Sequence, residues 1–96
     1  SVELIDLRTI NPYDTETIVS SVKKTGRCVI AHEAPKTAGF AAELIASINE
    51  KALLSLQAPV VRVTSPDVSF PLAKLENYFL PDVNRVIKGI EKVMRF

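Results

Sequence analysis

The sequence predicts an α/β domain, a three-layer sandwich in which a mostly parallel sheet carries helices on both faces. Strand-like and helix-like segments alternate along the chain, which is the order of a parallel sheet with crossover helices. One strand-like segment, "RCVIA" at residues 27–31, is a continuous apolar run. Such runs are typical of strands covered on both faces. A central strand is therefore expected there.

The first third of the chain supplies a strand and a helix. Residues 2–7, "VELIDL", are apolar or β-branched at most positions and stop at the turn formers "NPYD", which predicts a strand. Asp14 suits a helix N-cap, and Gly26 suits a helix end. A helix is therefore predicted over residues 15–24.

Two further helices and one strand follow the central strand. The most regular helical stripe predicts a helix over residues 38–54, and its members are Ala41, Leu44, Ile45, Ile48 and Ala52. "APVVRVTS" predicts a strand over residues 60–64, and residues 68–81 are expected to form a loop with room for one helical turn. Asp82 is the predicted N-cap of the last helix, whose apolar positions are Val83, Val86, Ile87, Ile90, Val93 and Met94.

Length and composition indicate one globular domain over residues 1–96. Hydrophobic residues make up 47% of the chain, which excludes a disordered or fibrous protein. The formal net charge is +1, so no overall charge favours nucleic acid or an anionic membrane. The single cysteine, Cys28, is expected to be a buried structural thiol. Because strand-like sequence begins at residue 2, we expect the domain to be cut from a longer polypeptide.

The segment "AHEAPKTAGFAAEL" contains the only histidine, His32, beside Glu33. Ligands bind at the carboxyl ends of strands in such sheets, so residues 6–13, 32–39 and 64–70 are expected along one edge. His32 and Glu33 have the chemistry of an acid and base pair. Adjacent strand residues point to opposite faces, however, which favours a structural or interface histidine. No cluster has metal-ligand spacing.

Residues 36–39, which begin with Lys36, lead into the best helix and offer a second candidate site. Free N–H groups at a helix N-terminus bind anions. The alternative is that Gly39, the only glycine of this turn, lets the helix pack close to the sheet. Both interpretations remain open from the sequence.

The segment "SFPLAKLENYFLP" gathers large apolar side chains, including Phe70 and Tyr78, in the least regular part of the chain. These residues either cover the core or form a contact surface. Phe96 adds an aromatic ring and, if it is the natural end, a carboxylate that would pair with a partner's arginine.

Four segments together carry a resemblance to a known family. They are "VELIDLRTINPYDTETI", "HEAPKTAGFAAELIASI", "LQAPVVRVTSPDVSFP" and "YFLPDVNRVIKGIEKVMRF". In this order they resemble the transketolase C-terminal domain in the beta subunit of the thiamine-diphosphate-dependent decarboxylase of 2-oxo acid dehydrogenase complexes. "HEAP" is more similar to the branched-chain (2-oxoisovalerate) enzymes than to the pyruvate enzymes.

The resemblance implies a tetramer of two alpha and two beta subunits that decarboxylates a 2-oxo acid and passes the acyl group to lipoyl-lysine. It also implies that other domains bind thiamine diphosphate, so the isolated chain is expected to be inactive. The compartment implied is the cytoplasm in a prokaryote and the mitochondrial matrix in a eukaryote.

The role that the resemblance implies for this domain is assembly. The implied partners are the alpha subunit, a second beta subunit and the peripheral subunit-binding domain of the dihydrolipoamide acyltransferase. In pyruvate-type relatives this docking involves acidic groups around the position of Gln57 and the terminal carboxylate, here that of Phe96. Gln57 stands where relatives often carry glutamate. Two other hypotheses stay open, a free-standing anion-binding module at residues 36–39 and an enzyme that uses His32 and Glu33.

Overall fold

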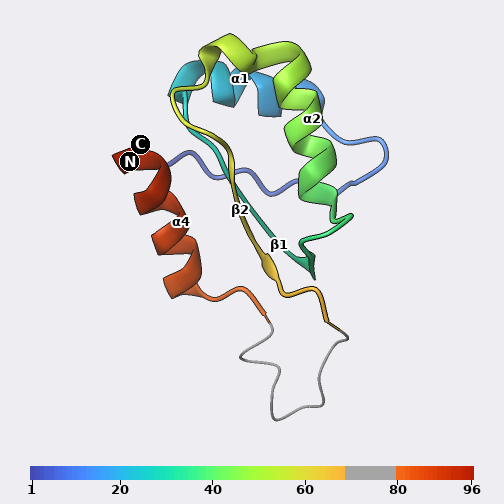
Figure 1. Cartoon of the computed structure of the whole chain (residues 1–96). Helices are drawn as coiled ribbons and strands as arrows, with labels where there is room; N and C mark the ends of the chain where they lie inside the picture. The colour runs from blue at the N-terminus through green and yellow to red at the C-terminus, as the bar shows by residue number, and fades with distance from the viewer. Residues whose placement is uncertain (69–79) are drawn as a thin grey trace.

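A computed structural model describes residues 1–68 and 80–96 of the chain. The described elements follow one another in alternation, as Figure 1 shows. Their bounds are α1 (Thr15–Thr25), β1 (Val29–Pro35), α2 (Phe40–Ala52), a short 3-10 helix η1 (Leu53–Ser55), β2 (Val61–Ser65) and α4 (Val83–Arg95). The predicted loop with Phe70 and Tyr78 falls largely on residues 69–79, which lie outside the described residues.

The two described strands form a parallel pair. Val29 is opposite Val61, Ile30 is opposite Arg62, and Ala31 is opposite Val63. The register then shifts before Pro35 pairs with Ser65. A parallel pair joined by α2 is the crossover unit that the alternating sequence pattern predicts.

Helices cover both faces of this pair, so the predicted three layers are confirmed (Figure 1). On one face, Val22 of α1 and the fully buried Ile48 of α2 form a core cluster against which Ile30 packs. On the other face, Gly89 lets α4 approach the strands closely. A Cβ at Gly89 would lie 2.9 Å from Cγ2 of Val63.

The caps of α1 and α4 lie where the sequence predicts them. Asp14 caps α1 by accepting a hydrogen bond from the Thr17 N–H, and Gly26 ends it in the left-handed conformation with φ of 74°. Asp82 caps α4 by accepting from the Arg85 N–H. None of the helices in the described part of the chain has the length and apolar character that a membrane span requires.

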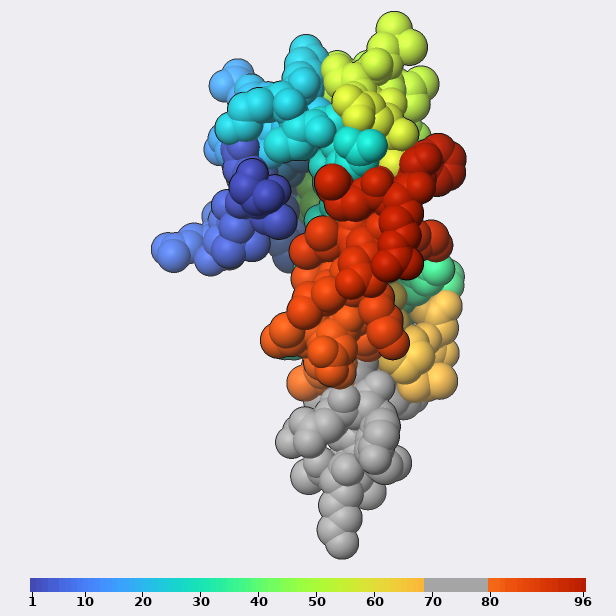
Figure 2. All heavy atoms as spheres, turned by 90° about the vertical axis from the view of Figure 1, so that its left-hand side faces the viewer, coloured from blue at the N-terminus to red at the C-terminus, as the bar shows by residue number. Residues whose placement is uncertain are grey.

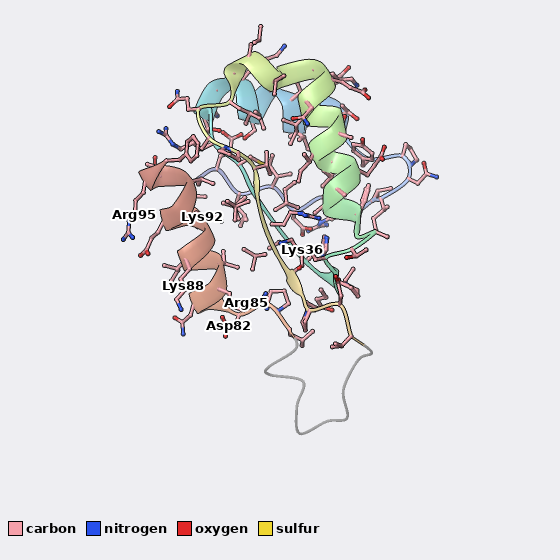
Figure 3. All side chains as sticks on the ribbon, viewed as in Figure 1. Lys36, Asp82, Arg85, Lys88, Lys92 and Arg95 are labelled. Carbon is pink, nitrogen blue, oxygen red and sulfur yellow. The ribbon has the colours of Figure 1, made fainter. Side chains whose placement is uncertain are left out.

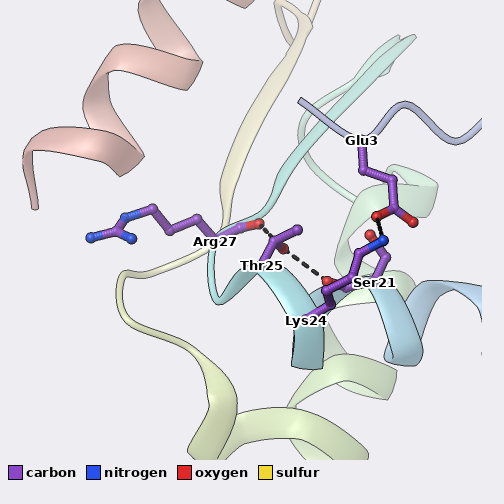
Figure 4. Close-up of polar contacts among 5 residues, drawn as sticks. All are labelled: Glu3, Ser21, Lys24, Thr25 and Arg27. Carbon is purple, nitrogen blue, oxygen red and sulfur yellow. Dashed lines mark hydrogen bonds and ion pairs between the residues drawn. The ribbon is translucent and has the colours of Figure 1, made fainter. Parts of the chain in front are cut away.

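The predicted strand at residues 2–7 is wrong. These residues form no regular element, and Leu4 is 90% exposed. Glu3 forms an ion pair with Lys24 of α1, as Figure 4 shows, but no strand among the described residues pairs with the segment. The apolar pattern is present, but a strand exists only when a neighbouring strand pairs with its backbone groups.

Two other bounds differ from the prediction. β1 continues to Pro35, so His32 and Glu33 lie within the strand rather than in the turn after it. The helix predicted over residues 38–54 begins at Phe40 and ends at Ala52, where the chain tightens into η1.

Candidate functional site

The carboxyl ends of the two strands meet at one edge, as parallel pairing requires. The Thr37 N–H donates to Oδ1 of Asp67 at 2.9 Å, and the Thr37 hydroxyl donates to Oδ2 of the same carboxylate at 2.5 Å. The ring of Tyr13 packs edge-on against Phe40, with ring centroids 5.3 Å apart. Parts of the three segments expected along this edge therefore meet there.

His32 and Glu33 are not joined at this edge. Neither ring nitrogen of His32 has a hydrogen-bond partner among the described residues, and both nitrogens are buried. Glu33 is exposed. Neighbouring residues of a strand point to opposite faces, and the structure gives no hydrogen bond or ion pair between these two side chains. The geometry does not assemble an acid and base pair.

Gly39, the N-cap of α2, lies against the end of β1. A Cβ at this position would lie 2.4 Å from the backbone oxygen of Pro35 and 2.8 Å from Nε2 of His32. Both separations are far below van der Waals contact, so only glycine fits without movement. This is the close packing that the second interpretation of Gly39 requires.

Within residues 36–39, Thr37 is already hydrogen-bonded to a carboxylate of the chain itself. Asp67 accepts hydrogen bonds from both the N–H and the hydroxyl of Thr37, which are donors that a bound anion would need. These two hydrogen bonds hold the pKa of Asp67 below its ordinary value. A fixed negative charge at this turn opposes the binding of another anion, so the structure does not favour the anion-binding hypothesis.

Acid should weaken this junction of the two strand ends. Because the folded-state pKa of Asp67 is lowered, its carboxylate stabilises the fold above the ordinary carboxyl pKa of about 3.9, and that contribution is lost as the pH falls through the lowered value. We expect Asp67→Asn to lower the unfolding midpoint at pH 6 and to flatten its decline toward pH 3. The measurement is thermal unfolding across that range. Glu50→Gln, a change at an exposed carboxylate of α2, is the control and should leave the pH profile intact.

Cys28 is half-buried and packs against the α1–α2 core cluster. Burial raises the pKa of its thiol, which keeps the thiol protonated at neutral pH and therefore unreactive. In residues 1–68 and 80–96, no three His, Cys, Asp or Glu residues come together as a metal site would require.

Gln57 and Phe96 lie at the opposite end of the domain, near the start of the strands. Arg27 connects the two regions. Its Nη1 donates to Oε1 of Gln57 at 2.7 Å, and its Nε donates to the backbone oxygen of Val93 in the last turns of α4 at 2.9 Å. The exposed ring of Phe96 lines the same hollow as residues 58–62, immediately after Gln57. The structure thus brings Gln57 and Phe96 to one end.

Sequence reasoning missed the residue that connects them. Figure 4 shows the Arg27 side chain extending away from α1, while its backbone oxygen accepts a hydrogen bond from the Thr25 hydroxyl. The carbonyls of a helix C-terminus carry partial negative charge and lack intrahelical partners, so a cation is expected near them. This rule predicts a cation near the end of α4. It does not predict that the cation is Arg27, which is 66 residues from Val93 in sequence.

The chain is similar to beta subunits of 2-oxo acid dehydrogenases. It is 48% identical over 96 residues to the pyruvate dehydrogenase E1 component subunit beta of Bacillus subtilis, covering 100% of this chain and 30% of that protein. It is 55% identical over 94 residues to the mitochondrial 2-oxoisovalerate dehydrogenase subunit beta of Dictyostelium discoideum, covering 98% of this chain and 25% of that protein. The chain therefore spans less than a third of the length of these relatives.

The family comparison agrees with the architecture. Residues 1–86 match the family described as "Transketolase, C-terminal domain". That match covers most of the chain, including the parallel strand pair and the junction at Asp67. The chain belongs to the transketolase C-terminal domain family.

Proposed function

We propose that the chain is the C-terminal assembly and docking domain of the beta subunit of a 2-oxo acid dehydrogenase. In the full tetramer with alpha subunits, that enzyme oxidatively decarboxylates a 2-oxo acid and transfers the acyl group to lipoyl-lysine. The 55% identity to a 2-oxoisovalerate dehydrogenase beta subunit supports a branched-chain substrate. The 48% identity to a pyruvate dehydrogenase beta subunit leaves pyruvate as the alternative. The compartment proposed is the cytoplasm of a prokaryote or the mitochondrial matrix of a eukaryote.

The docking role rests on one observation: Arg27 is hydrogen-bonded both to Gln57 and to the end of α4. Arg27 holds Gln57 and the Val93 carbonyl together, and the Phe96 ring beside them is 76% exposed. An exposed aromatic ring next to fixed polar groups is the usual composition of an interface anchor. We propose that the peripheral subunit-binding domain of the dihydrolipoamide acyltransferase binds at this end.

Helix α4 offers a second surface suited to assembly. Val83, Ile87 and Met94 lie on one side of the helix and are 74%, 46% and 61% exposed. The sheet covers only the side with Gly89 and Val93. Figure 2 shows α4 across the front of the domain. An apolar helix side left uncovered is expected at a contact with another subunit, and we propose an alpha or a second beta subunit there.

We propose that this domain does not hold thiamine diphosphate. A diphosphate that is bound through Mg²⁺ needs carboxylate or carbonyl oxygen ligands for the metal. The part of the chain that the structure describes brings no three His, Cys, Asp or Glu residues together. We propose that other domains of the full enzyme bind this cofactor and that the 96 residues alone do not catalyse decarboxylation.

Calorimetric titration of the complete heterotetramer with the peripheral subunit-binding domain tests the docking role. Phe96→Ala should weaken binding about tenfold, as truncation of an aromatic anchor does. The matched control is Leu54→Ala, which truncates a fully exposed apolar side chain on η1. If Phe96→Ala leaves the affinity unchanged, or if Phe96→Ala and Leu54→Ala lower it equally, then the end of α4 is not the docking site.

A further inference from the structure

Among the described residues, no strand pairs with the second backbone edge of β2. Among the described residues β2 pairs only with β1, and the Val61 N–H donates to the Cys28 carbonyl on that side. Backbone groups of successive residues in an extended strand point alternately to its two sides. The N–H and C=O groups of Val60 and Arg62 therefore point away from β1. The Thr64 carbonyl points the same way, and it accepts a hydrogen bond from the Arg85 guanidinium of α4.

A hollow of about 270 Å³ runs along the open part of this edge, and we call it the edge groove. Three cationic side chains line it, those of Lys36, Arg62 and Lys92. Its other lining residues are 58–61, Val93 and Phe96. No carboxylate side chain is among the described residues that line the edge groove. Three positively charged side chains thus lie beside the exposed backbone of the strand with no negatively charged side chain to balance them.

The cations stand on both sides of the edge. Arg62 is opposite Ile30, which packs toward α1 and α2, so the Arg62 side chain leaves from the face opposite to α4. Lys92 comes from α4 on the other face. The Arg62 Nη1 also donates to the Lys36 carbonyl at 3.2 Å, which holds that guanidinium beside residue 36.

The positive charge continues along α4. Arg85, Lys88, Lys92 and Arg95 are spaced three, four and three residues apart along α4, and Figure 3 shows where each lies on the helix. A second hollow of about 420 Å³ lies beside three of them and shares Lys92 with the edge groove. Its one carboxylate, that of Glu91, is already paired with Arg95 at 3.6 Å. The unbalanced charge of the region stays positive.

We propose that an extended acidic segment of a partner protein binds the edge groove by adding to β2 as the next strand. Its backbone would bond to the outward groups of Val60 and Arg62, which only a peptide reaches in register. Side chains of an added strand alternate between the faces, so acidic residues an odd number apart would meet Lys92 on one face and Arg62 on the other. The outward backbone groups of the strand and the net charge of only +1 favour a peptide over nucleic acid.

This inference goes beyond the docking role proposed above, because it concerns the backbone edge of β2 and a partner of acidic character; Phe96, the anchor of the docking role, lies at the rim of the same hollow. The competing explanation is protective. Cations on an edge strand discourage unwanted strand pairing, and Lys36, Arg62 and Lys92 would then repel other edges without binding anything. The two explanations differ in whether an acidic strand is accepted.

Two fluorescent decapeptides of equal Glu and Val content test the proposal on the full-length subunit. In the first peptide, glutamates are three residues apart and therefore alternate between faces. In the second, all glutamates are an even number apart and share one face. We expect the first peptide to bind about tenfold more tightly in fluorescence anisotropy, since it alone pairs with both sets of cations. It should also slow amide hydrogen exchange at Arg62.

Charge-removal variants complete the test. Arg62→Gln with Lys92→Gln should weaken binding of the first peptide about tenfold. Lys51→Gln, a matched change in the last turn of α2, should not change it. Equal binding of both peptides, unchanged exchange at Arg62, or equally tight binding to phosphatidylserine vesicles or to duplex DNA would overturn the proposal. Absence of binding would also overturn it and would support edge protection. Because Phe96 also lines the edge groove, the docking role is judged by titration with the peripheral subunit-binding domain and not by binding of these peptides.

Discussion

Gly39→Ala is expected to lower the free energy of unfolding by about 2 to 3 kcal/mol, the upper range for forcing extra atoms into a packed site. The new Cβ would lie 2.4 Å from the Pro35 backbone oxygen and 2.8 Å from the His32 ring. The cause is steric alone, because φ of Gly39 is −73°, which alanine adopts readily. Urea unfolding at equilibrium measures the change.

Gly89→Ala is the matched control for this steric argument. Its Cβ would lie 2.9 Å from Cγ2 of the buried Val63, a milder overlap than the one with the Pro35 backbone oxygen at Gly39. Alanine is also favoured over glycine inside a helix by about 1 kcal/mol. The two terms oppose each other, so stability should change by less than about 1 kcal/mol. A larger loss at Gly89 than at Gly39 would contradict the packing described for the α2–β1 contact.

A double variant separates the two clashes at Gly39. His32→Ala removes the ring but leaves the Pro35 backbone oxygen in place. Gly39→Ala is measured twice, in the parent chain and in the chain that already carries His32→Ala. We expect Gly39→Ala to lower the free energy of unfolding less in the His32→Ala chain, but still to lower it. Full recovery would mean that the His32 ring alone limits the approach of α2.

The elements with strong local patterns could be predicted from the sequence. The predicted stripe of α2 is buried at Ala41, Leu44, Ile48 and Ala52, and α1 and α4 begin beside their predicted caps. Residues 2–7 carry an equally clear strand pattern but do not form a strand. Pairing depends on a neighbour, and a single segment contains no information about that neighbour. Helix patterns are satisfied within the segment, whereas strand patterns are not.

The contacts of the candidate sites could not be predicted from the same patterns. Thr37 and Asp67 are 30 residues apart, as are Arg27 and Gln57, and each pair depends on how the elements pack. Gly39 was predictable only as one of two alternatives. The alternation of strand residues did indicate that His32 and Glu33 would not meet. Local geometry was therefore the reliable guide, and long-range polar contacts required the fold.

Arg27→Ala should lower the free energy of unfolding by about 2 kcal/mol, because it removes two hydrogen bonds made by a charged donor. One bond reaches the Val93 carbonyl at 2.9 Å and the other reaches Gln57 at 2.7 Å. Amide exchange in the last turn of α4 should become faster. Arg27→Lys should recover only part of the loss, because an ammonium lacks the planar fork that reaches both acceptors.

A double-mutant cycle with Gln57→Ala then isolates the pair. Gln57 is exposed, so Gln57→Ala alone should cost less than Arg27→Ala, which also loses the bond to α4. The coupling energy should be about 0.5 to 1 kcal/mol, the range for a partly exposed contact. Zero coupling would mean that Arg27 acts only on α4. Gln57 would then not be fixed beside the helix end, and the docking surface proposed there would lose the contact that shapes it.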